Sequence, residues 1–145
     1  MRRYLVVANR TVAGRHLVDL VRDCREHGPC WFFILVPATG AGRGGTASAE
    51  AQTLARRRLA GAIARFEAEG ASVHGEVGSC DPLSAVCAVT ARYSFDEVIL
   101  STLAPGASEW LLARLPARIE LATGLPLTHV IGDGVPDARR PTAPV

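Results

Sequence analysis

Residues 30–36 read Cys-Trp-Phe-Phe-Ile-Leu-Val, an unbroken apolar run of the length of one strand. A second apolar run, Tyr-Leu-Val-Val-Ala, covers residues 4–8, and a third forms the last part of the segment 96–100. A strand that is apolar at every position buries both of its faces, which is typical of parallel sheets covered by helices on both sides. These runs therefore predict a parallel sheet at the centre of the fold.

Amphipathic segments separate the apolar runs, so strands and helices alternate along the chain. The expected strands cover residues 4–8, 30–36, 72–78, 96–100 and 125–131, and the third is the most polar and is expected at an edge. The expected helices cover residues 14–27, 51–70, 82–90 and 108–122, with an interruption at Pro116, and a loop covers 101–108. The inner face of the third helix is expected to carry Leu83, Val86, Cys87 and Thr90. The pattern predicts one doubly wound α/β domain over residues 1–131 and a disordered tail over 132–145.

Composition narrows the classes of function. The 145 residues carry a formal charge of +2, and every basic residue is arginine. Without lysine, P-loop and Schiff-base chemistry are excluded. The one dense basic run, Arg56 to Arg58, has no aromatic ladder beside it, so no nucleic-acid partner is expected. No apolar run approaches the length of a membrane span, and we expect a cytoplasmic protein without a membrane partner.

Cysteine and histidine residues form no metal-binding pattern. The four cysteines include no Cys-x-x-Cys pair, and the four histidines are scattered singly, so no metal site is expected. The cysteines are expected to act as small buried apolar residues. No catalytic constellation stands out, and we expect a protein that is not an enzyme.

Ligands of doubly wound sheets bind at the carboxyl ends of the strands, where the strand order reverses. This rule places a candidate site near Asn9, Val36 and the segment 101–106. The segment Gly40 to Gly45 matches G-x-G-x-x-G, but its loop is long and no acidic residue ends a following strand. We interpret it as a surface loop that can cover the site rather than as a dinucleotide fingerprint. The candidate ligand-contacting residues from this rule are Asn9, Val36, Ser101, Thr102, Gly106 and Ser108.

Over residues 3–131 the sequence resembles the universal stress proteins. The resemblance rests on the order and lengths of the elements, on the first strand, and on the terminal block from Phe95-Asp96-Glu97-Val98 to Gly124-Leu125-Pro126-Leu127. It implies an adenine nucleotide alpha hydrolase-like fold with strand order 3-2-1-4-5. It also implies a regulatory or protective binding module, with ATP or another adenine nucleotide as the expected ligand. Homodimers of that family commonly form through the last strand, here Leu125 to Ile131.

The chain departs from the ATP-binding pattern of that family. ATP-binding members carry an acidic residue after the first strand, and this position falls on Asn9. Their three motif glycines fall on Ser101, Ala104 and Arg114, and Leu115 takes the place of the following hydroxyl residue. Pro116 then has no N–H to offer a phosphate. We therefore expect ATP binding to be weakened or absent, while Arg114 remains a candidate for an anion and the backbone near Val36 for an adenine.

Two alternatives stay open at this point. In the first alternative, the chain is a structural, dimeric interaction protein that binds no ligand. In the second, Cys80, which lies just before the Asp81-Pro82 helix start, is the nucleophile of a redox protein. No resolving cysteine lies near it in the sequence.

Overall fold

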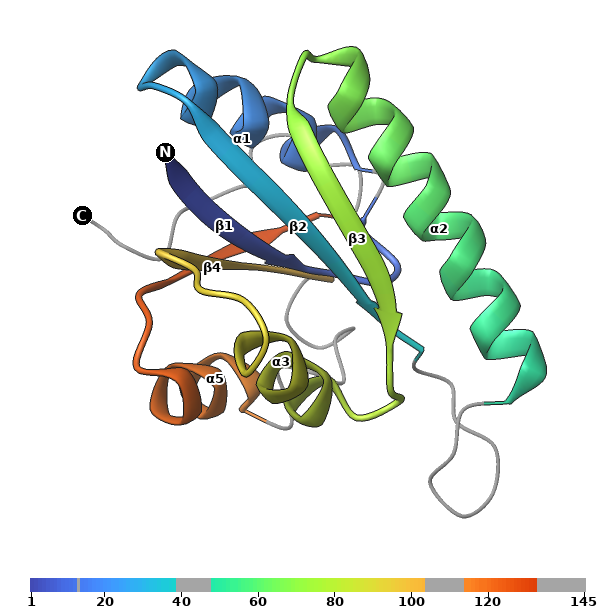
Figure 1. The fold of residues 1–145 in the computed structure, drawn as a ribbon. Coiled ribbons are helices and arrows are strands. Elements are labelled where there is room, and N and C mark those ends of the chain that lie inside the picture. The colour runs from blue at the N-terminus through green and yellow to red at the C-terminus, as the bar shows by residue number, and fades with distance from the viewer. Residues whose placement is uncertain (13, 39–47, 104–113, 133–145) are drawn as a thin grey trace.

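A computed structural model describes residues 1–12, 14–38, 48–103 and 114–132. Its centre is a five-stranded parallel sheet in the order β3-β2-β1-β4-β5 (Figure 1). The strands are β1 (Arg2–Val7), β2 (Cys30–Pro37), β3 (Ser72–Gly78), β4 (Glu97–Thr102) and β5 (Leu127–Ile131). The predicted doubly wound α/β fold and its strand order are confirmed, and β3 lies at an edge as its polarity predicts.

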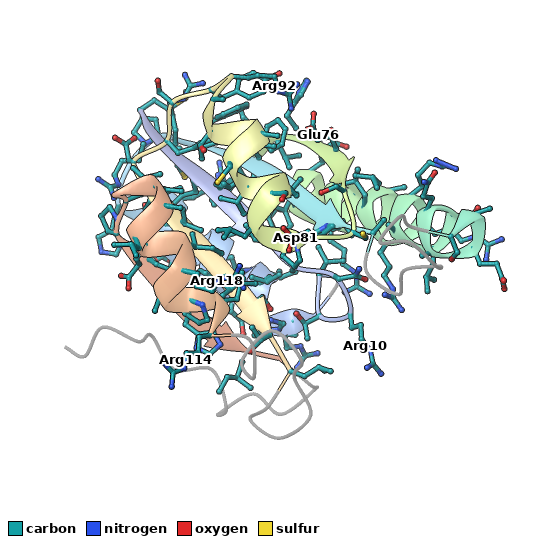
Figure 2. All side chains as sticks on the ribbon, turned by 90° about the horizontal axis from the view of Figure 1, so that it is seen from below. Arg10, Glu76, Asp81, Arg92, Arg114 and Arg118 are labelled. Carbon is teal, nitrogen blue, oxygen red and sulfur yellow. The ribbon has the colours of Figure 1, made fainter. Side chains whose placement is uncertain are left out.

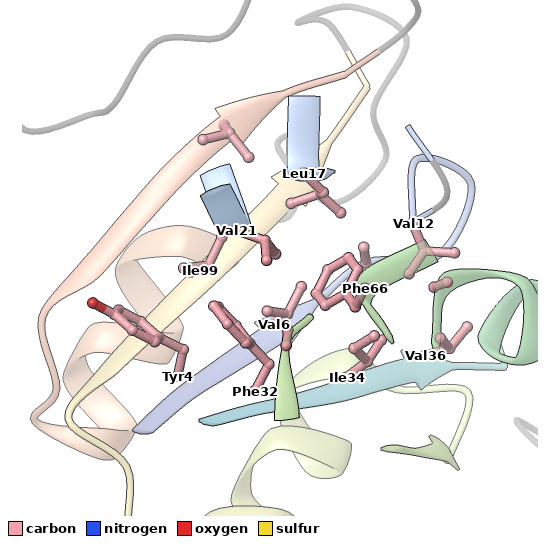
Figure 3. Packing of buried hydrophobic residues seen from close by; sticks show 14 of the residues in the cluster. Tyr4, Val6, Val12, Leu17, Val21, Phe32, Ile34, Val36, Phe66 and Ile99 are labelled. Atoms are coloured by element: carbon pink, nitrogen blue, oxygen red, sulfur yellow. The ribbon is translucent and has the colours of Figure 1, made fainter. Parts of the chain in front are cut away.

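Two hydrophobic clusters form on the two faces of the sheet because successive side chains of a strand point to opposite sides. Tyr4, Val6, Phe32 and Ile34 belong to the first cluster, which Figure 3 shows in close view. Their sequence neighbours in β1 and β2, such as Leu5 and Phe33, belong to the second cluster. The uninterrupted apolar runs of the sequence are therefore explained by burial on both faces.

Helices cover each face. Helices α1 (Arg15–Glu26) and α2 (Ala49–Ala68) pack on the first cluster, and α3 (Pro82–Thr90) and α5 (Leu115–Thr123) pack on the second (Figure 1). The Ser48 side chain caps α2 by accepting a hydrogen bond from the backbone N–H of Ala51. The Asp81 side chain caps α3 in the same way, by accepting a hydrogen bond from the backbone N–H of Ser84. The cap at Asp81 with a following proline is thus confirmed.

Two local predictions are wrong. Ser101 and Thr102 end strand β4 instead of beginning a loop, because their backbones continue the parallel ladder with β5. The buried face of α3 carries Ala85, Val86 and Val89, and Cys87 is exposed. Val86 is buried as expected, but Ala85 and Val89 take the other core positions, so a buried role is wrong for Cys87.

Several expectations concern residues outside the described ranges. They are the loop Gly40 to Gly45, the ligand candidates Gly106 and Ser108, the helical pattern over 108–113 and the tail after residue 132. Within the described ranges, none of the helices combines the length and apolar character that crossing a membrane requires.

Candidate ligand site at the carboxyl edge of the sheet

The carboxyl ends of the parallel strands bring the candidate residues to one edge. Asn9 follows β1, Pro37 ends β2, and Ser101 and Thr102 end β4. Asn9, Ser101 and Thr102 are all buried polar residues. The Val36 side chain is fully buried in the first cluster, so only its backbone can face a ligand. The edge is therefore lined by polar groups held in place by the sheet.

The Asn9 side chain is held from two sides. Its Nδ2 donates to the carbonyl oxygen of Pro37 at 2.5 Å, and its Oδ1 accepts a hydrogen bond from Nη1 of Arg58 on α2. The amide orientation is fixed because the carbonyl requires a donor and the guanidinium requires an acceptor. An aspartate at this position would place a carboxylate oxygen against the Pro37 carbonyl, so the local structure favours the amide.

Ser101 is the centre of a buried polar cluster. Its Oγ lies 2.5 Å from Oγ1 of Thr11 and 2.7 Å from Nε2 of His16 at the start of α1. All three residues are buried. The His16 ring packs against the backbones of Gly14 and Gly132, where an added Cβ would lie within 2.4 Å and 2.0 Å of the ring. These glycines leave the space that the ring needs to reach Ser101.

Thr102 makes the corresponding contacts on the opposite face of the sheet. Its Oγ1 lies 2.7 Å from Nε2 of His129 on β5 and 2.8 Å from the carbonyl oxygen of Leu103, to which it donates. Burial lowers the pKa of the His129 imidazole below its usual value. Both hydroxyls at the end of β4 are therefore engaged within the protein.

The start of α5 combines an arginine cap with a buried leucine and a proline. Arg114 adopts a left-handed conformation with φ 56°, and it is the one non-glycine residue of the described ranges with a positive φ. Leu115 is only 2% exposed because it packs into the second cluster. Pro116 occupies the first turn and donates no N–H. The left-handed backbone is the conformation that glycine adopts most easily.

The structure brings some of the candidate residues to one edge and adds others to them. Asn9, Ser101 and Thr102 lie at the predicted edge, and Arg114 starts the last helix, exposed to solvent. The sequence analysis did not predict Thr11, His16, Arg58 and His129, because each forms a hydrogen bond to a residue that is distant in the sequence.

Cys80 lies at the end of β3, partly buried, directly before the cap of α3. Within the part of the chain that the structure describes, no group of three or more His, Cys, Asp or Glu residues is arranged to hold a metal ion.

Comparison with known proteins connects this geometry to one fold. No family model matches the sequence, and no curated protein matches it by sequence either. A universal stress protein from Archaeoglobus fulgidus superposes with a TM-score of 0.64 at 15% identity, over 89% of this chain and 93% of that one. A universal stress protein family protein from Arabidopsis thaliana with AMP bound gives 0.65 at 11% identity, over 92% and 93%.

A further universal stress protein, in complex with cAMP, superposes with a TM-score of 0.61 at 12% identity, over 91% of this chain and 98% of that one. At these identities the similarity establishes the fold. The resemblance seen in the sequence is confirmed at that level: this chain has the fold of the universal stress proteins.

Proposed function

We propose that the chain is a small-ligand binding module of the universal stress protein type, which acts by binding and not by catalysis. Its site is the carboxyl edge of the sheet, between the ends of β1 and β4. Structures with this fold hold AMP in one case and cAMP in another, so an adenine nucleotide is the first ligand class to test. The position agrees with the general rule for doubly wound sheets.

The start of α5 carries the second part of the proposal, that ATP binding of the family type is weakened or absent. Phosphates bind helix starts through free backbone amides and the positive end of the helix dipole. Here the first turn contains Pro116, the hydroxyl position is the buried Leu115, and the glycine position carries the long side chain of Arg114. A phosphate at this helix start would therefore lack the amide donor of the proline position and the hydroxyl of the leucine position.

Calorimetric titration of AMP, cAMP and magnesium-ATP into the purified protein tests both parts. We expect AMP to bind and ATP to gain nothing from its additional phosphates. The double variant Arg114→Gly/Pro116→Ala, which restores the glycine and a backbone amide at this helix start, is expected to raise ATP affinity. Pro29→Ala is the matched control because Pro29 lies at the opposite edge of the sheet, before β2. Low-micromolar ATP affinity of the unmodified protein would contradict the second part.

A structural role as a homodimer is the second candidate. In the described part of the chain, β5 pairs with β4 on one side and ends the sheet on the other. A second copy that pairs there would cover backbone groups that otherwise invite aggregation. Light scattering is expected to give a dimer mass, and a monomer mass would refute this candidate. Native mass spectrometry then separates a dimer that carries a ligand from one that carries none.

A further inference from the structure

The charge at the end of β1 is positive. The Asn9 amide oxygen accepts a hydrogen bond from the guanidinium of Arg58. Arg58 comes from α2, is partly buried, and has no other hydrogen-bond partner within the described ranges. One nitrogen of its guanidinium is used and the remaining donors stay available.

A second arginine, Arg10, lies at the same end of β1. Arg10 follows Asn9 directly and is exposed, and Figure 2 shows it extending outward from the loop after β1. Burial first, and then repulsion from Arg10, lower the pKa of the Arg58 guanidinium below its usual value. Because Arg10 is the residue next to Asn9, the hydrogen bond between Asn9 and Arg58 places both arginines at the end of β1.

No acid compensates this pair within the described part of the chain. The ion pairs found there are Arg2–Glu97, Arg22–Asp19, Arg22–Glu69 and Arg92–Glu76. Neither Arg58 nor Arg10 takes part in them. Two adjacent cations at the ligand edge of a parallel sheet leave a site whose electrostatics favour an anion.

We propose that Arg58 and Arg10 bind a phosphoryl group of a small-molecule ligand at the end of β1, with Asn9 orienting Arg58. The proposal rests on the function proposed above, since it assigns the anionic part of the ligand at the same edge. A guanidinium presents planar, paired donors that match two oxygens of a phosphoryl group. The proposed anion site lies on the β1–α2 side of the edge and not at the start of α5, where Pro116 has no amide to donate.

Nitrogen-15 NMR titrations with inorganic pyrophosphate, AMP and adenosine test the assignment. Pyrophosphate is expected to shift the amides of Asn9 and Arg10, and AMP to bind about tenfold more tightly than adenosine. Arg58→Gln is expected to abolish the pyrophosphate shifts and the advantage of AMP. Arg57→Gln is the matched control, because Arg57 is exposed on the same helix and is expected to leave both unchanged. If Arg58→Gln fails to fold, the exposed Arg10→Gln replaces it, with the same expected direction.

The outcomes separate the inference from the proposed function. Pyrophosphate shifts that persist in Arg58→Gln, or that are absent from the unmodified protein, would overturn the inference. Adenosine binding without any effect of pyrophosphate overturns the inference and leaves the proposed function in place. Pyrophosphate binding without adenosine binding supports the inference and contradicts the adenine part of the proposed function. Equal affinities for pyrophosphate and AMP would indicate that the site recognises an inorganic phosphate group, and a higher affinity for AMP would indicate a nucleotide.

Discussion

The substitution Gly132→Ala tests the packing of the carboxyl edge most sharply. The new Cβ would lie 2.0 Å from Cε1 and 2.2 Å from Nε2 of His16, whereas ordinary contacts begin near 3.4 Å. Gly132 is not among the glycines with positive φ, so alanine fits the backbone and the cost is steric. The ring has to move by more than an ångström, which breaks its 2.7 Å hydrogen bond to Ser101.

The magnitude follows from two terms. Forcing an extra methyl into a packed region costs about 1–3 kcal/mol. Leaving the buried Ser101 hydroxyl and the ring nitrogen poorly paired costs about 1–3 kcal/mol more. We expect a loss of about 2–4 kcal/mol in the free energy of unfolding, because the two relaxations overlap, and a fall of the midpoint temperature by about 6–12 °C.

Urea unfolding followed by circular dichroism measures the loss. Gly61→Ala is the matched control: its Cβ meets nothing within 4 Å on α2, and alanine there is expected to add about 0.5–1 kcal/mol. A double-mutant cycle identifies the cause, since His16→Ala removes the ring that the new methyl meets. If Gly132→Ala costs as much in the His16→Ala background as in the unmodified protein, the clash with His16 is not the cause and the reasoning fails.

Three further predictions concern other elements. Arg114→Gly relieves a left-handed backbone and is expected to raise the free energy of unfolding by about 1 kcal/mol. Arg118→Gly, inside α5, is the control and is expected to lower it by about 1 kcal/mol. If urea unfolding shows that both variants change the stability in the same direction, this prediction is contradicted. Asp81→Ala removes the cap of α3 and is expected to cost about 1 kcal/mol, while an unchanged midpoint would argue against the cap. Burial raises the pKa of the Cys24 thiol to about 11, so mass spectrometry after iodoacetamide treatment at mildly alkaline pH is expected to find Cys87 labelled before Cys24, and the reverse order would refute it. Because the folded pKa is raised, the stability from this thiol is fully present below its unfolded pKa and is lost as pH rises through about 11.

The fold could be predicted because local signals agreed with one another. Residues 30–36 have to be buried on both faces, which leaves few arrangements other than a covered parallel sheet. Asp81 and Pro82 mark a helix start from their own backbone chemistry. The polar composition of residues 72–78 correctly indicates an edge strand.

The polar contacts of the site could not be predicted in the same way. Arg58 is 49 positions from Asn9, and Ser101 is 85 from His16, so no periodicity links the partners. Ser101 and Thr102 carry loop-forming side chains, but the ladder with β5 holds them in the strand. The reading of Cys87 as buried failed because a short helix with many small residues offers two apolar faces, and packing against the sheet selects between them.

Mapping AMP on the protein by amide chemical shifts tests the central claim most directly. The account predicts that AMP shifts the amides of Asn9 and Arg10 after β1, of Ala38 after β2 and of Leu103 after β4, and leaves those of Leu115 and Ala117 nearly unchanged. Shifts concentrated at the start of α5, or no shifts at the ends of the strands, would contradict it.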